Sequence, residues 1–157
     1  MSKVIVKAPK RDMFKVIKYA DIVLDTSQIN RTLYTAEENV TLVRTIIRGT
    51  YVNDGASERS LIVIHKSNPD LSVPSIQANT SVDDVYSTDS ENQLNLYNHG
   101  FRGSSTVLSQ EVNGDVKGMR KLRKNETISL SGISNTASGG TFAGTITLFF
   151  KIVTGKP

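Results

Sequence analysis

The sequence predicts an all-β fold: a single-domain, eight-stranded jelly-roll β-sandwich. Three observations predict it. Several segments rich in β-branched residues alternate apolar and polar side chains, turn-forming residues separate them, and no segment predicts a helix longer than two turns. The length of 157 residues is that of one domain. The predicted strands span residues 14–24, 40–52, 59–65, 85–97, 105–112, 115–120, 126–131 and 144–153.

The closing segment of the chain has the clearest alternation. Along residues 144–153, apolar side chains occupy one side of an extended strand and mostly polar side chains occupy the other. One side comprises Ile146, Leu148, Phe150 and Ile152, and the other comprises Thr145, Thr147, Phe149 and Lys151. Because Phe149 interrupts the polar side, we expect that side to be covered in part by a loop or by another subunit.

Two short turn sequences predict tight hairpins. Asn53, Asp54 and Gly55 tolerate positive φ and favour a reversal between the second and third predicted strands. Asn113 and Gly114 give the same signal between the fifth and sixth predicted strands. We therefore expect each of these two strand pairs to be neighbours in a sheet.

The other connections are predicted to be less regular. Residues 35–38 match a capping box, which predicts a single helical turn, and residues 98–100 predict a turn. Residues 66–84 contain Pro69 and Pro74 among many polar residues, which indicates a long loop of the kind that often carries contacts in β-sandwiches. The first predicted strand is apolar on both faces, as is typical of a strand buried on both sides or at a subunit boundary.

Positive charge is concentrated at the start of the chain. Six cations against Asp12 give the first 18 residues a net charge of +5, so the remaining 139 residues sum to −1. A basic arm on a nearly neutral body fits a polyanion partner, and a solvated terminus is the other interpretation of the same pattern. The candidate nucleic-acid contacts are Lys3, Lys7, Lys10, Arg11, Lys15 and Lys18.

A second basic cluster places five positive charges within eight residues. If residues 120–125 link two strands, the cluster lies at a sheet edge, where phosphate, an acidic neighbouring subunit and water are all open as partners. The chain has no Trp, five Phe and five Tyr, which argues against a base-stacking platform and favours electrostatic contact with any nucleic acid. The cluster comprises Lys117, Arg120, Lys121, Arg123 and Lys124.

The sequence offers no constellation for catalysis. The absence of Cys excludes disulfides, thiolate chemistry and Cys-ligated metals. The two histidines, His65 and His99, lack metal-ligand spacing, and Ser104, Ser105 and Ser109 lie outside a G-x-S-x-G context. No apolar run reaches the roughly 18 residues of a membrane span. We therefore predict a soluble, non-enzymatic protein without catalytic residues, cofactor or metal.

Several predicted strands together resemble capsid proteins of small circular Rep-encoding single-stranded DNA viruses. The resemblance covers roughly residues 40–153, and it is most evident in a basic segment followed by a polar connection, an acidic residue and a closing strand rich in Thr and Phe. The segments that carry it are VRTIIRGTYV (43–52), RSLIVIH (59–65), VKGMRKL (116–122), ETISLS (126–131) and GTITLFFKIV (144–153).

The resemblance implies a jelly-roll subunit, residues 14–157, that assembles with many copies of itself into a small icosahedral shell around circular single-stranded DNA. Residues 1–13 would form an inward-facing basic arm, and residues 7–11 also fit a nuclear-import signal. Family members often carry long arginine-rich arms, whereas this arm is short and rich in lysine. About sixty copies would bring about +300 charges, fewer than the phosphates of a genome of about two kilobases, so counterions or further basic residues would neutralise the rest.

The rival hypothesis is a β-sandwich ligand-binding module, either lectin-like or a small receptor-binding oligomer, in which long loops bind the ligand. It predicts a small oligomer without nucleic acid. For the coat protein, the loops expected to make shell contacts are residues 66–84, 98–104 and 132–143.

Overall fold

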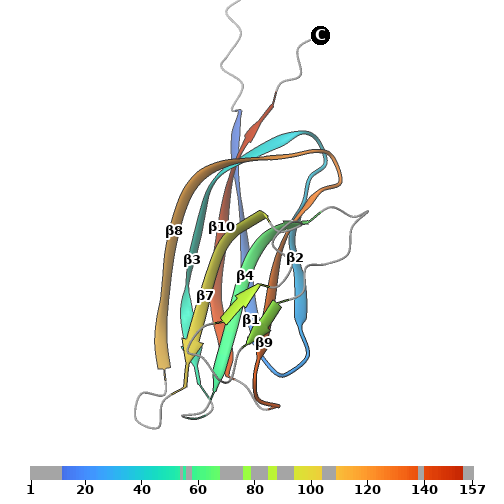
Figure 1. Ribbon diagram of the computed structural model, residues 1–157. Helices are drawn as coiled ribbons and strands as arrows, with labels where there is room; N and C mark the ends of the chain where they lie inside the picture. The colour runs from blue at the N-terminus through green and yellow to red at the C-terminus, as the bar shows by residue number, and fades with distance from the viewer. Residues whose placement is uncertain are drawn as a thin grey trace, which may run out of the picture.

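The computed structural model describes residues 12–53, 55, 58–67, 76–78, 85–87, 94–103, 109–137 and 140–153. These residues form ten strands and contain no helix, and so none that could span a membrane (Figure 1). The strands are β1 (Met13–Val23), β2 (Ile29–Thr35), β3 (Val40–Val52), β4 (Arg59–Ser67), β5 (Ile76–Ala78), β6 (Val85–Ser87), β7 (Leu94–Arg102), β8 (Ser109–Leu122), β9 (Thr127–Ser134) and β10 (Thr141–Ile152).

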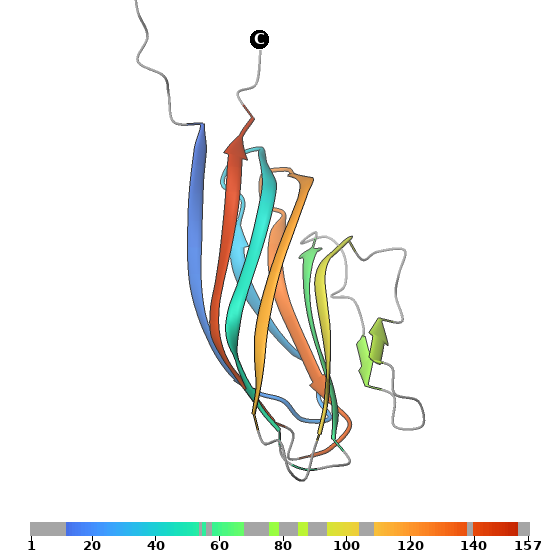
Figure 2. The same ribbon diagram turned by 90° about the vertical axis from the view of Figure 1, so that its left-hand side faces the viewer.

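The eight longer strands form two antiparallel four-stranded sheets. Sheet A has the order β1-β10-β3-β8, and sheet B has the order β2-β9-β4-β7. The chain crosses between the sheets after β1, β2, β3, β7, β8 and β9, which is the strand arrangement of a jelly roll, so the predicted fold class is confirmed. The short β5–β6 ladder lies outside sheet B, where β5 contacts β4 and β9 (Figure 2).

The core fills the space between the two sheets. In β10, Ile146, Leu148 and Phe150 point inward and are fully buried, whereas Thr147 and Phe149 between them are partly exposed. This alternation confirms the two faces predicted for the closing strand. Burying one side chain of this size stabilises the fold by about 1.5–3 kcal/mol.

The predicted hairpin at residues 53–55 is wrong, although both of its strands exist. β3 pairs with β10 and β8, and β4 pairs with β7 and β9, so this connection crosses from sheet A to sheet B. Turn-forming residues specify a reversal of the chain, but they do not specify which sheet the next strand joins. Here strands distant in sequence occupy both hydrogen-bonding edges of β3.

The predicted hairpin at Asn113 and Gly114 is also wrong, because both residues lie inside β8, which pairs with β3 from end to end. Gly114 is buried. A Cβ atom there would lie 2.5 Å from a ring carbon of Tyr97 and 2.7 Å from Cγ2 of Ile47. The glycine therefore permits close packing against the core and forms no turn.

Other differences concern weakly patterned segments. β2 is absent from the sequence prediction, and residues 36–39 between β2 and β3 contain a bend in place of the expected helical turn. The predicted strand at residues 85–97 is divided between β6 and the first part of β7, and the predicted turn at residues 98–100 lies within β7. β1 begins at Met13, but residues 1–11 lie outside the described part of the chain, so the division into arm and body stays a prediction.

Candidate nucleic-acid interface

The two predicted basic groups start from different parts of the chain. Lys15 and Lys18 lie exposed on β1, whereas the other four arm residues, Lys3, Lys7, Lys10 and Arg11, lie outside the described residues. The second group extends from β8 into the β8–β9 connection, and all five of its side chains are exposed. These are Lys117, Arg120, Lys121, Arg123 and Lys124.

The register of sheet A brings members of both groups onto one face. One row of the sheet runs from Lys15 on β1 to Lys117 on β8. Lys15 pairs with Phe149 on β10, Phe149 pairs with Arg44 on β3, and Arg44 pairs with Lys117. The neighbouring row carries Lys151 on β10 and Lys121 on β8. At about 4.8 Å between strands, each row spans about 14 Å across the sheet. We call this the basic surface, formed by Lys15, Arg44, Lys117, Lys121 and Lys151.

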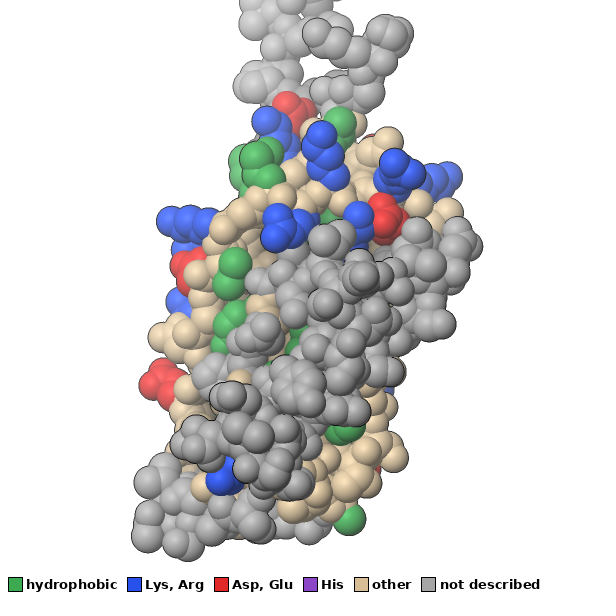
Figure 3. Space-filling model, in the orientation of Figure 1, with side chains coloured by type: hydrophobic (Ala, Val, Ile, Leu, Met, Phe, Trp, Pro, Cys, Tyr) green, Lys and Arg blue, Asp and Glu red, His purple; other side chains and the backbone are tan. Residues whose placement is uncertain are grey.

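The basic surface lies at the end of the sandwich where the chain enters β1 and leaves β10. Met13 and Lys151 are paired there, so the residues before Met13 continue from this end. Figure 3 shows Lys and Arg side chains gathered toward this end of the molecule. Arg44 and Lys151 were not predicted from the sequence because neither belongs to a charge run. Each lies singly in a strand that alternates apolar and polar residues.

Arg44 is the one member of the basic surface with a specific ionic partner among the described residues. Its Nε donates to Asp115 Oδ1 at 2.8 Å, and its Nη2 donates to Asp115 Oδ2 at 2.5 Å. Its guanidinium carbon also lies 5.7 Å from the centre of the Phe149 ring. The hydrogen bonds from Arg44 hold the pKa of Asp115 below its ordinary value. Arg44 is thereby neutralised, and the four lysines supply the net charge of the surface.

The β8–β9 connection is held in place by a largely buried ion pair. Lys66 Nζ lies 3.0 Å from Glu126 Oε2, and Glu126 Oε1 accepts a hydrogen bond from the backbone N–H of Arg123 at 2.7 Å. Asn125 adopts a positive φ of 75°, which Asn tolerates better than most residues. These contacts fix the turn from which Arg123 and Lys124 project into solvent.

The same face of sheet A exposes an unusual amount of apolar surface. Ile17 is 46% exposed, Tyr19 is 85% exposed and Val23 is 59% exposed on β1, and Val52 on β3 is 47% exposed. At the basic end, Met13 and Phe149 flank an open groove of about 580 Å³. Contiguous exposed apolar patches of this kind are typical of contact surfaces.

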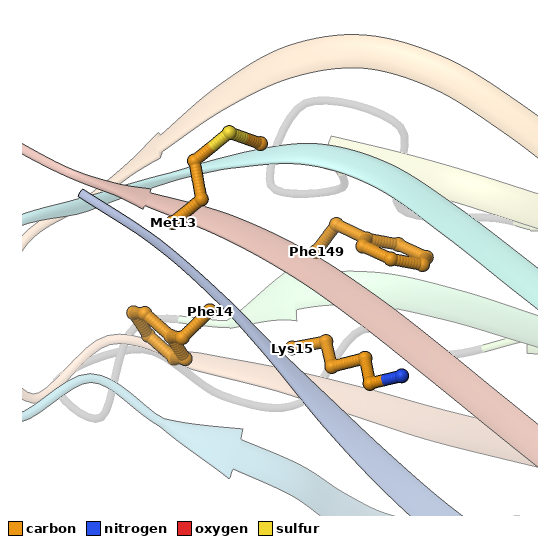
Figure 4. Close-up of a pocket in the computed structure, with 4 residues that line it drawn as sticks. All are labelled: Met13, Phe14, Lys15 and Phe149. Carbon is orange, nitrogen blue, oxygen red and sulfur yellow. The ribbon is translucent and has the colours of Figure 1, made fainter. Parts of the chain in front are cut away.

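Figure 4 shows how this groove is built. Met13 and Phe149 project from the adjacent strands β1 and β10, Lys15 extends along the groove, and Phe14 points to the other side of β1. There Phe14 stacks on Phe150 with ring centres 5.2 Å apart. Phe149 is partly exposed, so its expected cover by a loop or another subunit stays a prediction.

The described residues bring together no group of three or more His, Cys, Asp or Glu side chains that could hold a metal. His65 is fully buried, with its Nε2 2.8 Å from Ser131 Oγ, and Ser131 donates to Asn30 Oδ1 at 2.7 Å. Burial lowers the pKa of His65. This chain of hydrogen bonds joins β4, β9 and β2, which gives His65 a structural role. The side chain of His99 lies outside the described residues.

A second buried polar cluster lies at the opposite end of the sandwich. Glu58 Oε1 accepts hydrogen bonds from the Tyr51 hydroxyl, from Ser60 Oγ at 2.7 Å and from the backbone N–H of Gly140 at 2.7 Å. Burial raises the pKa of Tyr51, whose ring stacks on Phe101 at 3.9 Å. This cluster ties the β3–β4 and β9–β10 connections together, and nothing in the sequence pattern predicted it.

Comparisons with known proteins give no family assignment. No family model matches the sequence, and neither does any curated protein. One similar solved structure is the Eiger TNF of S. frugiperda, at 8% identity and a TM-score of 0.46, covering 94% of this chain and 97% of that one. Two others are infectious bursal disease virus of the Gx strain (10% identity, TM-score 0.44) and the Gt strain (7% identity, TM-score 0.41), each covering 99% of this chain.

This chain spans only 38% and 39% of the length of the two virus chains. Every one of these TM-scores is below 0.5 and every identity is below 25%. We therefore argue function from the residues of this chain alone.

Proposed function

We propose that the protein is a viral coat subunit that assembles into a closed icosahedral shell, as part of a virion, and packages circular single-stranded DNA through electrostatic contacts. One observation carries the proposal: cations from β1, β10 and β8 gather on one face of sheet A, at the end where the basic N-terminal segment joins the body. A surface of this kind suits the inside of a shell, where it would meet the phosphates of a packaged strand.

The body cations supply charge that the short arm lacks. Apart from Arg44 and Lys66, which are paired with Asp115 and Glu126, six cations beyond residue 18 lie at this end, so about sixty copies would add about +360 to the roughly +300 of the arms. This roughly doubles the positive charge that faces the genome, although counterions would still neutralise part of it. These six are Lys117, Arg120, Lys121, Arg123, Lys124 and Lys151.

The exposed apolar side chains of sheet A support assembly. Tyr19 and Val23 lie further along β1 than the basic surface, so this part of the face can contact another copy while the basic end meets the packaged strand. Burying Ile17, Tyr19 and Val23 against another copy would remove them from water.

Nuclear import through residues 7–11 is proposed only as a secondary role of the arm.

Charge removal tests the packaging role. Deleting residues 1–12 should leave assembly intact and lower the nucleic-acid content of the particles, because it removes Lys3, Lys7, Lys10 and Arg11 and ends before the first strand. The triple substitution Lys117→Gln, Lys121→Gln and Lys151→Gln should lower it further, as measured by the ratio of absorbance at 260 and 280 nm. Particles that form normally and keep all of their nucleic acid in both variants would refute packaging by these residues.

A further inference from the structure

β1 is an edge strand with one side open to pairing. It lies at one end of sheet A and, within the described part of the chain, forms a ladder with β10 alone. Every second residue of such a strand directs its backbone N–H and C=O groups away from the sheet. Figure 2 shows β1 at the border of the sandwich. From Met13 to Val23, the strand offers about 37 Å of this edge.

The other three edge strands are interrupted, whereas β1 is regular. Proteins commonly protect sheet edges from further pairing with bulges, prolines or short strands. The ladders of β2, β7 and β8 each contain a register shift, and the extra residue lies on the edge strand each time. The ladder of β1 runs from Met13 to Val23 without a shift, and the strand contains no proline. β1 is therefore the edge best suited to accept another strand.

The outward side chains of β1 are self-complementary in one antiparallel register. A second copy related by a two-fold axis presents the same strand in the opposite direction. When Lys18 lies opposite its own copy, Lys15 lies opposite Asp21, and the symmetry makes this pair of opposite charges twice. The other outward pairs join exposed apolar side chains: Met13 with Val23 and Ile17 with Tyr19.

Neighbouring registers fit less well. Moving the second strand by two residues places Asp21 opposite Ile17 in one direction and opposite Met13 in the other. Either shift leaves the carboxylate facing an apolar side chain and loses its pairing with Lys15. Moving the strand by one residue would set outward side chains opposite inward ones, which a continuous sheet does not permit.

The inward side of the same register has one unfavourable contact. Lys18 lies on the core side of β1 and faces its own copy across the axis. Because Lys18 is exposed, its ammonium group can turn toward solvent, and the like charges weaken the contact without blocking it. The remaining inward pairs are apolar: Phe14 with Ile22 and Val16 with Ala20.

We infer that two copies of this chain join through β1, antiparallel and across a two-fold axis, with Lys15 of each copy opposite Asp21 of the other. The four strands of sheet A in each copy then form one continuous sheet, joined by about ten backbone hydrogen bonds. The contact leaves most of the outer face of sheet A open. The inference rests on the proposed function for the role of this pair as a unit of the shell, but the pair can be measured in unassembled protein.

Charge reversal tests the register. The dissociation constant of the dimer is measured by sedimentation velocity on the full chain, at a salt concentration and pH where shells are absent. Lys15→Asp and Asp21→Lys each place two pairs of like charges in the contact and should raise the constant about tenfold or more. The double variant restores both ion pairs in reverse and should return the constant close to the wild-type value.

Glu111→Lys is the matched control for Asp21→Lys. Glu111 is exposed in the same row of sheet A as Asp21, but it lies on β8, the opposite edge strand. The two substitutions change the charge of the chain equally, so the control should leave the dissociation constant unchanged. Circular dichroism checks that each variant is folded.

Variants at Lys18 test the position of the axis. Lys18→Thr removes the pair of like charges and should tighten the dimer, the opposite of the effect at Lys15. The chain has no cysteine, so Lys18→Cys carries one thiol, which meets its own copy at a Cα separation that suits a disulfide. This variant should form a cross-linked dimer on mild oxidation. Val23→Cys, exposed at the end of the same strand and opposite Met13, should not.

These results separate the inference from the proposed function. If the wild type forms shells but charge reversal has no effect and Lys18→Cys does not cross-link, the edge pairing is wrong although the coat function stands. If the dimer shows the expected charge dependence but no shells form under any condition, the pairing holds and the coat function fails. A folded wild type that stays monomeric at high concentration and forms no shells overturns both.

Discussion

The outer faces of the two sheets differ in how completely the chain itself covers them. On sheet B, Leu61 and Val63 point away from the main core and are still only 2% and 1% exposed, forming a small second cluster with Ile133. On sheet A, Ile17 and Tyr19 point outward and remain 46% and 85% exposed. Sheet B is therefore covered within one chain, whereas the apolar side chains on the outer face of sheet A remain exposed.

The connection between β4 and β7 explains part of this difference. It contains β5 and β6, and β5 contacts β4 and β9 on the outer side of sheet B (Figure 2). The turns that flank β10 and β3 in sheet A are shorter, and within the described residues they place no strand over its outer face. Under the proposed function, other copies and the packaged strand supply this missing layer.

The largest effect on assembly should come from placing charge in the middle of the outer face of sheet A. Ile17→Asp with Ile46→Asp puts two carboxylates on the outer face, aligned through Thr147, and should abolish assembly while leaving a folded monomer. Size-exclusion chromatography and circular dichroism measure the two properties. Thr35→Asp, at an exposed position of β2, is the control and should assemble normally. Intact particles from the double variant would show that this face makes no contact between copies.

Truncation on sheet B should instead affect the fold. Leu61→Ala should lower the free energy of unfolding by about 2–4 kcal/mol, because it opens a cavity in the second cluster. Ile17→Ala on sheet A should change the same quantity by no more than about 0.5 kcal/mol in the unassembled subunit. Urea denaturation of both variants under dissociating conditions gives the comparison. Equal losses would mean that the two outer faces are equally buried in the single chain.

Protonation of His65 on β4 of sheet B should have a smaller effect on the free energy of unfolding. Burial lowers its pKa from the ordinary value of 6.5, so the folded state favours the neutral ring. Its contribution is complete above pH 6.5 and is lost as the pH falls, because the unfolded chain then takes up the proton more readily. We therefore expect the free energy of unfolding to fall between pH 7 and pH 5.

Urea titrations at each pH measure this loss. The reference is His65→Gln, because glutamine does not titrate and still places a polar group near Ser131. The variant should lose less stability than the wild type over the same interval. Parallel curves for the two proteins would assign the pH dependence to other groups.

Much of the fold follows from local pattern, but the pairing of strands does not. β3, β4 and β10 were predictable because apolar residues alternate or run continuously along them. β2 was not, because among its seven residues only Leu33 is fully buried, as befits an edge strand. Gly114 misled the prediction because a glycine required by tight packing looks the same in sequence as a glycine in a turn.

The candidate site shows the same division between local and long-range information. The arm and the cluster at residues 117–124 were visible as charge runs, but only the register of sheet A places Lys15 in line with Lys117. Arg31, another exposed cation, lies on β2, the strand that the sequence did not predict. Single cations become part of a site only when long-range pairing aligns them.

The most direct test of the central claim is negative-stain microscopy of the purified full chain across a size-exclusion column, with the 260/280 nm absorbance ratio of each peak. The coat hypothesis predicts uniform shells of roughly 20 nm with an absorbance ratio raised by nucleic acid. A peak of monomers or small oligomers without nucleic acid, over a range of salt and pH, would contradict it and favour the ligand-binding module.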